Sequence, residues 1–293
     1  MQKKQIVVLV AVMAIMGYLF FLPVKGLKKQ KSGDGHTNAP ISKARKVNQV
    51  SVEMVSAAAK VAIGNSLAAQ VTDLEKQLKS SNEGPAKLAL QKQLAKKWDD
   101  VNQQAPAAFY YLEIAKQENT FNNWLEAGRH FNEAFKFTQD TVVQPFFVVN
   151  ALTAYKNAIK LNSKSFDAKT GLGIAFVNQT SLGMADADGG SPMQGIMMLL
   201  DVVKQDPNNV NANLSLGMFA MKSGQYDKAV LRFKTIIAQK PNDLEPYFYM
   251  AESYKQLGMN KEALAAYQKC KELNPDPDFG QQINNYIKDI TKK

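Results

Sequence analysis

Few residues of this chain have the type and spacing that catalysis or metal binding requires. The 293-residue sequence contains two histidines and one cysteine. His36 lies in a polar segment and His130 in a predicted helix, so they do not form a pair suited to metal binding or base catalysis. We expect His130 on a helix surface or in a groove. Cys270 has no base nearby in the pattern, and we expect it to be buried and inert.

Two short motifs resemble ligand-binding loops but lack essential residues. The run Asp-Ala-Asp-Gly-Gly at residues 186–190 invites a calcium interpretation, but Met184 and Gly195 would occupy the first and last ligand positions of an EF-hand loop. A polar turn is favoured there. Residues 171–173, Gly-Leu-Gly, lack the third glycine and the preceding strand of a nucleotide loop, so they indicate helix packing. We expect no catalytic residues, no cofactor and no metal.

The net charge of +10 is concentrated at one end of the chain. Residues 1–46 contain nine Lys or Arg against one acidic residue, Asp34, whereas residues 47–293 contain 27 basic and 25 acidic residues. A basic segment beside an apolar one indicates a contact with anionic lipid or a topology signal. A nucleic-acid surface would need basic residues spread over a folded face, so binding to nucleic acid is disfavoured.

An apolar segment at the amino end predicts a single membrane span. Residues 6–22 carry no charge, and the apolar stretch continues to Val24. Its 19 residues would reach about 28 Å as a helix, close to the hydrocarbon thickness of a bilayer. Pro23-Val24-Lys25 follows in place of a signal-peptidase sequence, which favours an uncleaved anchor over a signal peptide. Lysines on both sides nearly balance, and the short amino tail favours an exported domain.

Residues 25–46, polar and basic with several glycines, are predicted to form a flexible tether.

Residues 210–243 and 244–277 are two consecutive blocks of 34 residues that align without a gap. In this alignment Gly217 matches Ala251, Ala229 matches Ala263, and Phe233 matches Tyr267; Gly224 also matches Gly258 and Pro241 matches Pro275. The alternation of small and large residues resembles the tetratricopeptide repeat, which implies pairs of helices stacked closely through their small residues.

The same pattern extends upstream with longer connections between the helices. Residues 166–209 fit with an insertion within 178–191, and residues 121–165 fit with an insertion near 138–148, where Pro145 could begin an extended second helix. Residues 88–120 resemble a degenerate repeat without the glycine turn or the closing proline. Residues 47–80 are predicted to form one long helix, whose stripe of Leu67, Val71, Leu74 and Leu78 either packs on the first repeat or forms a homodimer seam. Packing is favoured.

The complete prediction is an all-α, right-handed superhelix of repeat helix pairs that follows an amino-terminal transmembrane helix. The domains are the anchor (1–24), the tether (25–46), a helical segment with the degenerate repeat (47–120), four repeats (121–277, divided into 121–165, 166–209, 210–243 and 244–277) and a capping helix (278–293). The apolar residues Phe279, Ile283, Tyr286, Ile287 and Ile290 would cover the end of the last repeat.

The resemblance implies a concave groove that binds a protein or peptide and is lined by the first helix of each pair. Carried over to this sequence, the groove residues are Glu126, Arg129, Asn132, Asp167, Thr170, Ile174, Asn211, Met218, Met221, Lys222, Phe248, Tyr249, Glu252 and Lys255. The alternative for some of them, Ile174 and Phe248 above all, is packing between repeats. The carboxylate clamp of some family members is not supported, because Thr170, Gly171, Leu214 and Ser215 occupy the places of its Lys, Arg and Asn residues.

These expectations define a non-enzymatic, membrane-anchored scaffold or adaptor. Its overall arrangement resembles bacterial single-span repeat proteins with ancillary roles in envelope assembly, secretion or protein quality control. We expect a single-pass protein of the bacterial inner membrane, in contact with lipid through residues 6–24 and with its carboxyl-terminal domain in the periplasm. The alternative is a cytoplasm-facing adaptor whose basic tether contacts anionic lipid or RNA and recruits a soluble complex.

Overall fold

The computed structural model describes residues 49–184 and 192–291. The predicted anchor and tether, and the Asp-Ala-Asp-Gly-Gly run, lie outside the described residues. Within these ranges every regular element is an α-helix. The helices are α2 (Val52–Lys60), α3 (Asn65–Ser80), α4 (Pro85–Asp100), α5 (Gln104–Glu118), α6 (Phe121–Phe137), α7 (Gln144–Leu161), α8 (Phe166–Ser181), α9 (Pro192–Gln205), α10 (Val210–Lys222), α11 (Tyr226–Gln239), α12 (Leu244–Gln256), α13 (Asn260–Leu273) and α14 (Pro277–Thr291).

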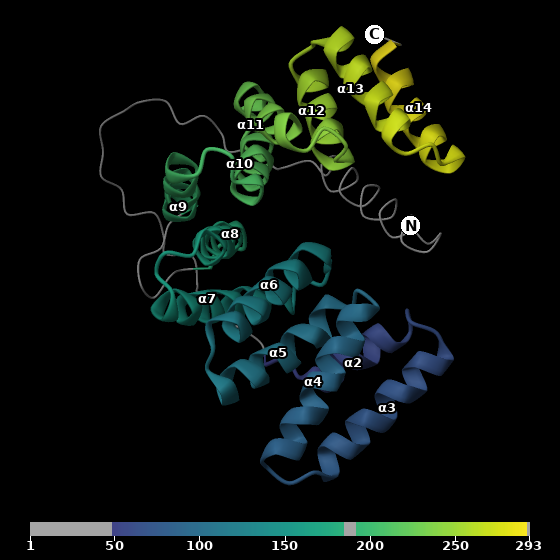
Figure 1. Cartoon of the computed structure of the whole chain (residues 1–293). Helices are drawn as coiled ribbons and strands as arrows, with labels where there is room; N and C mark the ends of the chain where they lie inside the picture. Colours follow the sequence, from purple (N-terminus) through teal and green to yellow (C-terminus); the bar gives the residue numbers. More distant parts are fainter. Residues whose placement is uncertain (1–48, 185–191, 292–293) are drawn as a thin grey trace, which may run out of the picture.

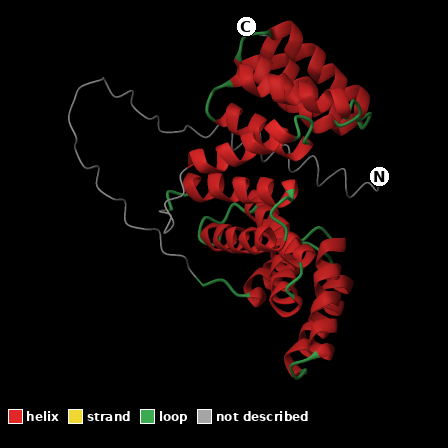
Figure 2. Cartoon of the chain, turned by 60° about the vertical axis from the view of Figure 1, so that its left-hand side comes forward, coloured by secondary structure: helices red, strands yellow, loops and turns green. Residues whose placement is uncertain are grey.

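The helices stack as consecutive pairs along a curved path (Figures 1 and 2). Five pairs, from α4 with α5 to α12 with α13, pack within themselves and against the next pair, and α14 packs on α13. We name the first helix of each pair its A helix and the second its B helix. We name the side formed by the A helices the inner face and the side formed by the B helices the outer face. The fold is the all-helical superhelix that the repeats predict.

The sequence marks where four of the five A helices begin. Thr120, Ser165 and Asn209 precede α6, α8 and α10, and each side chain accepts a hydrogen bond from a backbone N–H of the first turn. Asp243 does the same for α12. These side chains satisfy donors that the helix itself leaves without a partner, so each of these four repeats starts at a capping residue, whereas α4 follows Gly84.

Most of the A helices end in one type of turn. Gly183, Gly224 and Gly258 have φ values of 65°, 75° and 72°, and each is followed by a backbone N–H that bonds to a carbonyl five residues earlier. Asn102 closes α4 in the same way with a φ of 56°. Asparagine tolerates this left-handed conformation better than other residues that carry a side chain. The degenerate repeat therefore keeps the turn although it lacks the glycine.

Small residues lie where helices approach closely, as the repeat pattern predicts. A Cβ atom at Gly217 would lie 2.6 Å from the ring of Phe233, and one at Gly171 would lie 2.1 Å from the ring of Tyr155. Ala229, Ala251 and Ala263 are completely buried. Gly173 of the Gly-Leu-Gly run also lies against another helix, since its Cβ would be 2.9 Å from the carbonyl oxygen of Gly195. The run is a helix-packing element.

The prediction of one long helix over residues 47–80 is wrong, because the segment contains two helices. α2 ends at Lys60 and α3 begins at Asn65, with Gly64 at a φ of 79° between them. A positive φ breaks an α-helix and lets α3 turn back beside α2. Within the stripe, Val71 is buried and Leu74 and Leu78 pack on the cluster around α4 and α5, whereas Leu67 is more exposed. The stripe thus packs within the chain.

The insertion in the first repeat and the capping helix have the structures that the sequence predicts. α7 begins at Gln144 with Pro145 in its first turn, so the insertion near 138–148 extends this B helix. At the other end, Phe279, Ile283 and Ile290 of α14 are buried against α12 and α13. A solenoid needs such a cover because its last repeat otherwise exposes its apolar side. Across residues 49–184 and 192–291, none of the helices has both the length and the apolar character to cross a membrane.

Candidate protein-binding groove

The inner face curves enough for distant A helices to affect one another. Glu245, at the start of α12, is influenced electrostatically by Lys136 and Glu133 on α6, although α8 and α10 lie between these helices in the repeat order. Burial raises the pKa of the Glu245 carboxyl, and the positive charge of Lys136 partly opposes that shift. This influence agrees with the curved path of the helix pairs in Figures 1 and 2. None of these three residues belongs to the predicted groove set.

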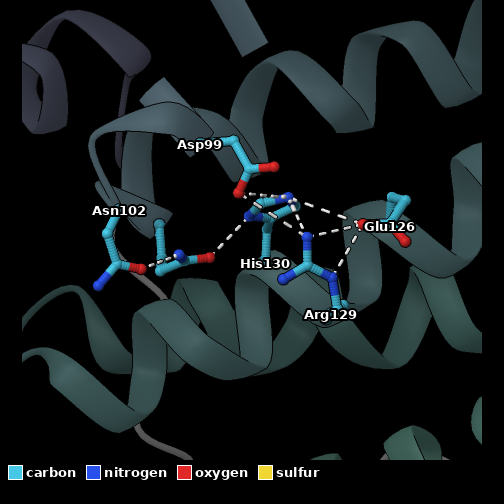
Figure 3. Close-up of polar contacts among 6 residues, drawn as sticks. Asp99, Asn102, Glu126, Arg129 and His130 are labelled. Atoms are coloured by element: carbon cyan, nitrogen blue, oxygen red, sulfur yellow. Dashed lines mark hydrogen bonds and ion pairs between the residues drawn. The ribbon is translucent and has the colours of Figure 1, made fainter. Parts of the chain in front are cut away.

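At the amino-terminal part of the inner face, Arg129 is held by three neighbours (Figure 3). Its Nε donates to Glu126 Oε2 at 2.8 Å, and its Nη2 lies 2.7 Å from the same oxygen and 2.8 Å from His130 Nε2. Asp99, at the end of α4, lies 3.9 Å from Nη2. The side chains of Glu126 and Arg129 remain partly exposed, so both predicted groove residues can reach a ligand.

His130 is completely buried, so the expectation of a surface or groove position for it is wrong. Its ring stacks on Tyr111 with centroids 4.4 Å apart, and its Nδ1 lies 2.7 Å from Gln104 Oε1. Because the Arg129 guanidinium only donates hydrogen bonds, Nε2 must accept and Nδ1 must donate to Gln104. The ring is then neutral.

Burial, helped by the positive charge of Arg129, lowers the pKa of His130 to about 3. Both imidazole nitrogens are thus engaged in hydrogen bonds, and the ring holds Arg129 in place. The buried ring is not available to solvent as a base.

In the middle of the inner face the predicted residues differ in exposure. Asp167 and Asn211 are exposed, Ile174 is partly exposed, and Asn132 and Thr170 are buried. Asn132 Nδ2 donates to the carbonyl oxygen of Gly171 at 3.0 Å, which ties α6 to α8. Asn132 and Thr170 thus lie in the packed interior, and Asp167 and Asn211 are open to a ligand. Ile174 packs partly on the apolar cluster of α9 and α10, the alternative named for it from the sequence.

At the carboxyl-terminal part, several predicted residues pack inside the solenoid. Phe248, Tyr249, Glu252 and Met221 are each less than 9% exposed. Glu252 accepts a hydrogen bond from the hydroxyl of Tyr267, and burial raises the pKa of its carboxyl. These four side chains contact neighbouring helices and not solvent.

The remaining predicted residues of this part stay accessible to different degrees. Met218 is partly buried and Lys222 is exposed. Lys255 is partly buried, with its ammonium 5.7 Å from the centre of the Tyr286 ring of α14. The cap therefore takes part in shaping this end of the inner face.

Sequence reasoning missed Glu133, Lys136 and Glu245. Glu245 has the same place in its repeat as Asp167 and Asn211, so the repeat register could have indicated it. Lys136 lies beyond the family's groove positions, and only the curvature of the solenoid brings it near α12.

Cys270 is buried, as expected, and burial raises the pKa of its thiol to about 12. Among the described residues no group of three or more His, Cys, Asp or Glu is placed to hold a metal ion.

Stacked helix pairs, small residues at their contacts and one continuous inner face define a helical-repeat solenoid. A profile of the family described as tetratricopeptide repeat matches residues 194–248 and 220–281. Residues 194–281 therefore contain repeats of the tetratricopeptide family, whose fold generally serves as a non-catalytic scaffold.

Solved structures agree on the fold. A thermophilic tetratricopeptide-repeat protein from Thermus thermophilus is similar over 70% of this chain and 100% of its own, with a TM-score of 0.53 and 18% identity. A tetratricopeptide-repeat protein from Parabacteroides merdae is similar over 76% of this chain and 79% of its own, with a TM-score of 0.52 and 16% identity. No curated protein sequence matches the chain.

Proposed function

We propose that this protein is a membrane-anchored, non-catalytic scaffold that binds a protein or peptide along its inner face. The observation that carries the proposal is the curved stacking of the A helices, which contact one another in sequence from α6 to α12 and leave several side chains accessible to a ligand (Figures 1 and 2). Charged and apolar groups share that face, a composition that gives both selectivity and adaptable contact area.

The direct contacts would come from the predicted residues that remain accessible. These are Glu126, Arg129, Asp167, Ile174, Asn211, Met218, Lys222 and Lys255. Arg129 is the strongest anchor, because His130 and Glu126 hold its guanidinium in one orientation and less side-chain entropy is lost on binding. The six buried members of the predicted set support the shape of the face.

We further propose an ancillary role in envelope assembly, secretion or protein quality control, with the solenoid in the periplasm. Support comes from the uncharged residues 6–22, the basic tether that follows, and the nearly neutral remainder of the chain. Catalysis is not part of the proposal, since the two residues best suited to it are a buried neutral imidazole and a buried thiol of raised pKa.

Site-specific photo-crosslinking in cells tests the inner face. A crosslinker at Met218 or Lys222 is expected to trap discrete protein partners, and one at Gln268, an exposed position of the B helix α13, serves as control. Replacing Arg129 with Ala should reduce the Met218 adducts, because it removes the anchor. Adducts that form at Gln268 and not at the inner positions would contradict the proposed site.

Protease treatment of spheroplasts tests the topology separately. A periplasmic solenoid is digested from outside, whereas a cytoplasmic one is protected until the membrane is permeabilised. Protection would refute export and favour the cytoplasm-facing adaptor, without bearing on the inner face.

A further inference from the structure

The outer face carries an apolar hollow that the proposed inner-face function does not use. It lies between the B helices α7 and α9, with α8 behind it, and measures about 520 Å³. Ile159 of α7 and Leu172 of α8 line it, together with Met193, Met197 and Met198 of α9. The hollow is thus a groove between consecutive B helices.

Exposed apolar side chains gather at this groove. Met193 and Met197 are 59% and 61% exposed, and Leu200, one turn further along α9, is 42% exposed. On α11, by comparison, Leu231 is the one large apolar residue with a similar exposed fraction, 64%. A cluster of exposed apolar side chains promotes aggregation unless another surface covers it, so this cluster indicates a docking site.

The excess of positive charge lies on the α7 side of the groove. Among the residues that line the groove, Lys169 of α8 and Asp201 of α9 carry opposite charges. On α7, Lys156 and Lys160 stand on either side of the lining residue Ile159 in the sequence, and the helix has no acidic residue. The complementary partner is apolar where it enters the groove and acidic where it faces α7.

We propose that this groove is a second docking site and that its occupant is an acidic amphipathic helix of a protein partner. Methionines adapt their shape to an inserted apolar stripe, and a groove between two helices accepts a third helix. Strand addition is excluded for the described residues, since they contain no sheet edge. A flat lipid surface would cover the rim but would not reach Leu172, which is 6% exposed at the floor. The site lies opposite the inner face, so the protein would join two partners.

The experiment uses the full chain in phosphatidylcholine nanodiscs. An environment-sensitive fluorophore is placed on Met197→Cys, or on Leu231→Cys as the matched control. The native Cys270 is completely buried with a raised thiol pKa, so it leaves the introduced thiol as the labelled one. The probes are a synthetic amphipathic peptide of about 18 residues with a leucine stripe and glutamate flanks, and the same peptide with lysine flanks.

The acidic peptide is expected to shift the fluorescence at position 197 and not at 231, and to half-saturate at a concentration roughly tenfold below that of the basic peptide. Met193→Glu should raise that concentration roughly tenfold by placing a like charge at the rim, whereas Leu231→Glu, at a residue of similar exposure, should leave it unchanged.

Equal binding of the two peptides, or equal effects of the two glutamate variants, would overturn the proposal. A shift caused by added vesicles of phosphatidylcholine and phosphatidylglycerol but by neither peptide would also overturn it and assign the face to lipid. Crosslinking at Met218 reports on the inner face independently, so either site can fail alone.

Discussion

Replacing Gly171 with Ala should destabilise the contact between α6, α7 and α8. The new Cβ would lie 2.1 Å from Cζ and 2.5 Å from the hydroxyl oxygen of Tyr155. The Tyr155 ring is 4% exposed within the core and also packs against Gly128, so it cannot move into solvent to make room. Overpacking of a core costs about 1–3 kcal/mol, and an overlap this large belongs at the upper end. Alanine favours the helix by about 1 kcal/mol relative to glycine, so the free energy of unfolding should fall by about 2 kcal/mol.

Hydrogen exchange is the suitable assay, because a solenoid opens locally. A loss of about 2 kcal/mol corresponds to exchange about thirtyfold faster at protected amides of α7 and α8. Gly280→Ala on α14 is the matched control, since its Cβ would meet only Lys271 Cε at 3.9 Å, and it should gain about 0.5–1 kcal/mol.

Adding Tyr155→Leu to the Gly171→Ala variant tests the cause. The two changes should cost less together than the sum of their separate effects, because leucine vacates the space that the new methyl group needs. The reasoning is refuted if Gly171→Ala exchanges like the wild type, or if Tyr155→Leu leaves its cost unchanged.

Three further outcomes follow from the described side chains. The pKa of His130 is about 3 in the folded chain against an ordinary 6.5, so the unfolded chain binds the proton first as the pH falls. The free energy of unfolding, measured by urea titration, should therefore decrease between pH 6.5 and 3 by up to about 1.4 kcal/mol per pH unit. The variant His130→Gln should show a smaller decrease. Cys270 should resist a thiol reagent in the native chain at neutral pH and react once urea unfolds it, and rapid native labelling would contradict its burial. Gly258→Ala should cost about 1 kcal/mol in urea unfolding although no atom lies within 4 Å of the new Cβ, because the φ of 72° is strained for alanine.

The repeats were predictable because their signals are local. The glycine turns at 224 and 258 and the small residues at 217 and 251 each act within one helix pair, and the structure uses them as the pattern indicates. The capping helix was predictable for a similar reason, since its apolar face is visible in the sequence.

What the sequence did not reveal depends on contacts between distant segments. His130 is buried because α5 supplies both Gln104, at its first position, and Tyr111, which the pattern of α6 alone does not indicate. Glu252 is buried because α13 supplies Tyr267. The leucine stripe begins only after Gly64, so it gave no sign of the break at that residue. Asn102 forms the turn after α4, where the repeat pattern requires a glycine.

The placement of α14 has a consequence for how chains of this architecture could change length. Its Tyr286 packs on Phe248 and Tyr267, both of which belong to the block 244–277 that precedes it. After a tandem duplication of that block, the terminal helix would pack on the same residues as before, and the new copy would pack on a block identical to itself. The molecule could thus grow by whole modules, in evolution or in the laboratory, without redesign of its end.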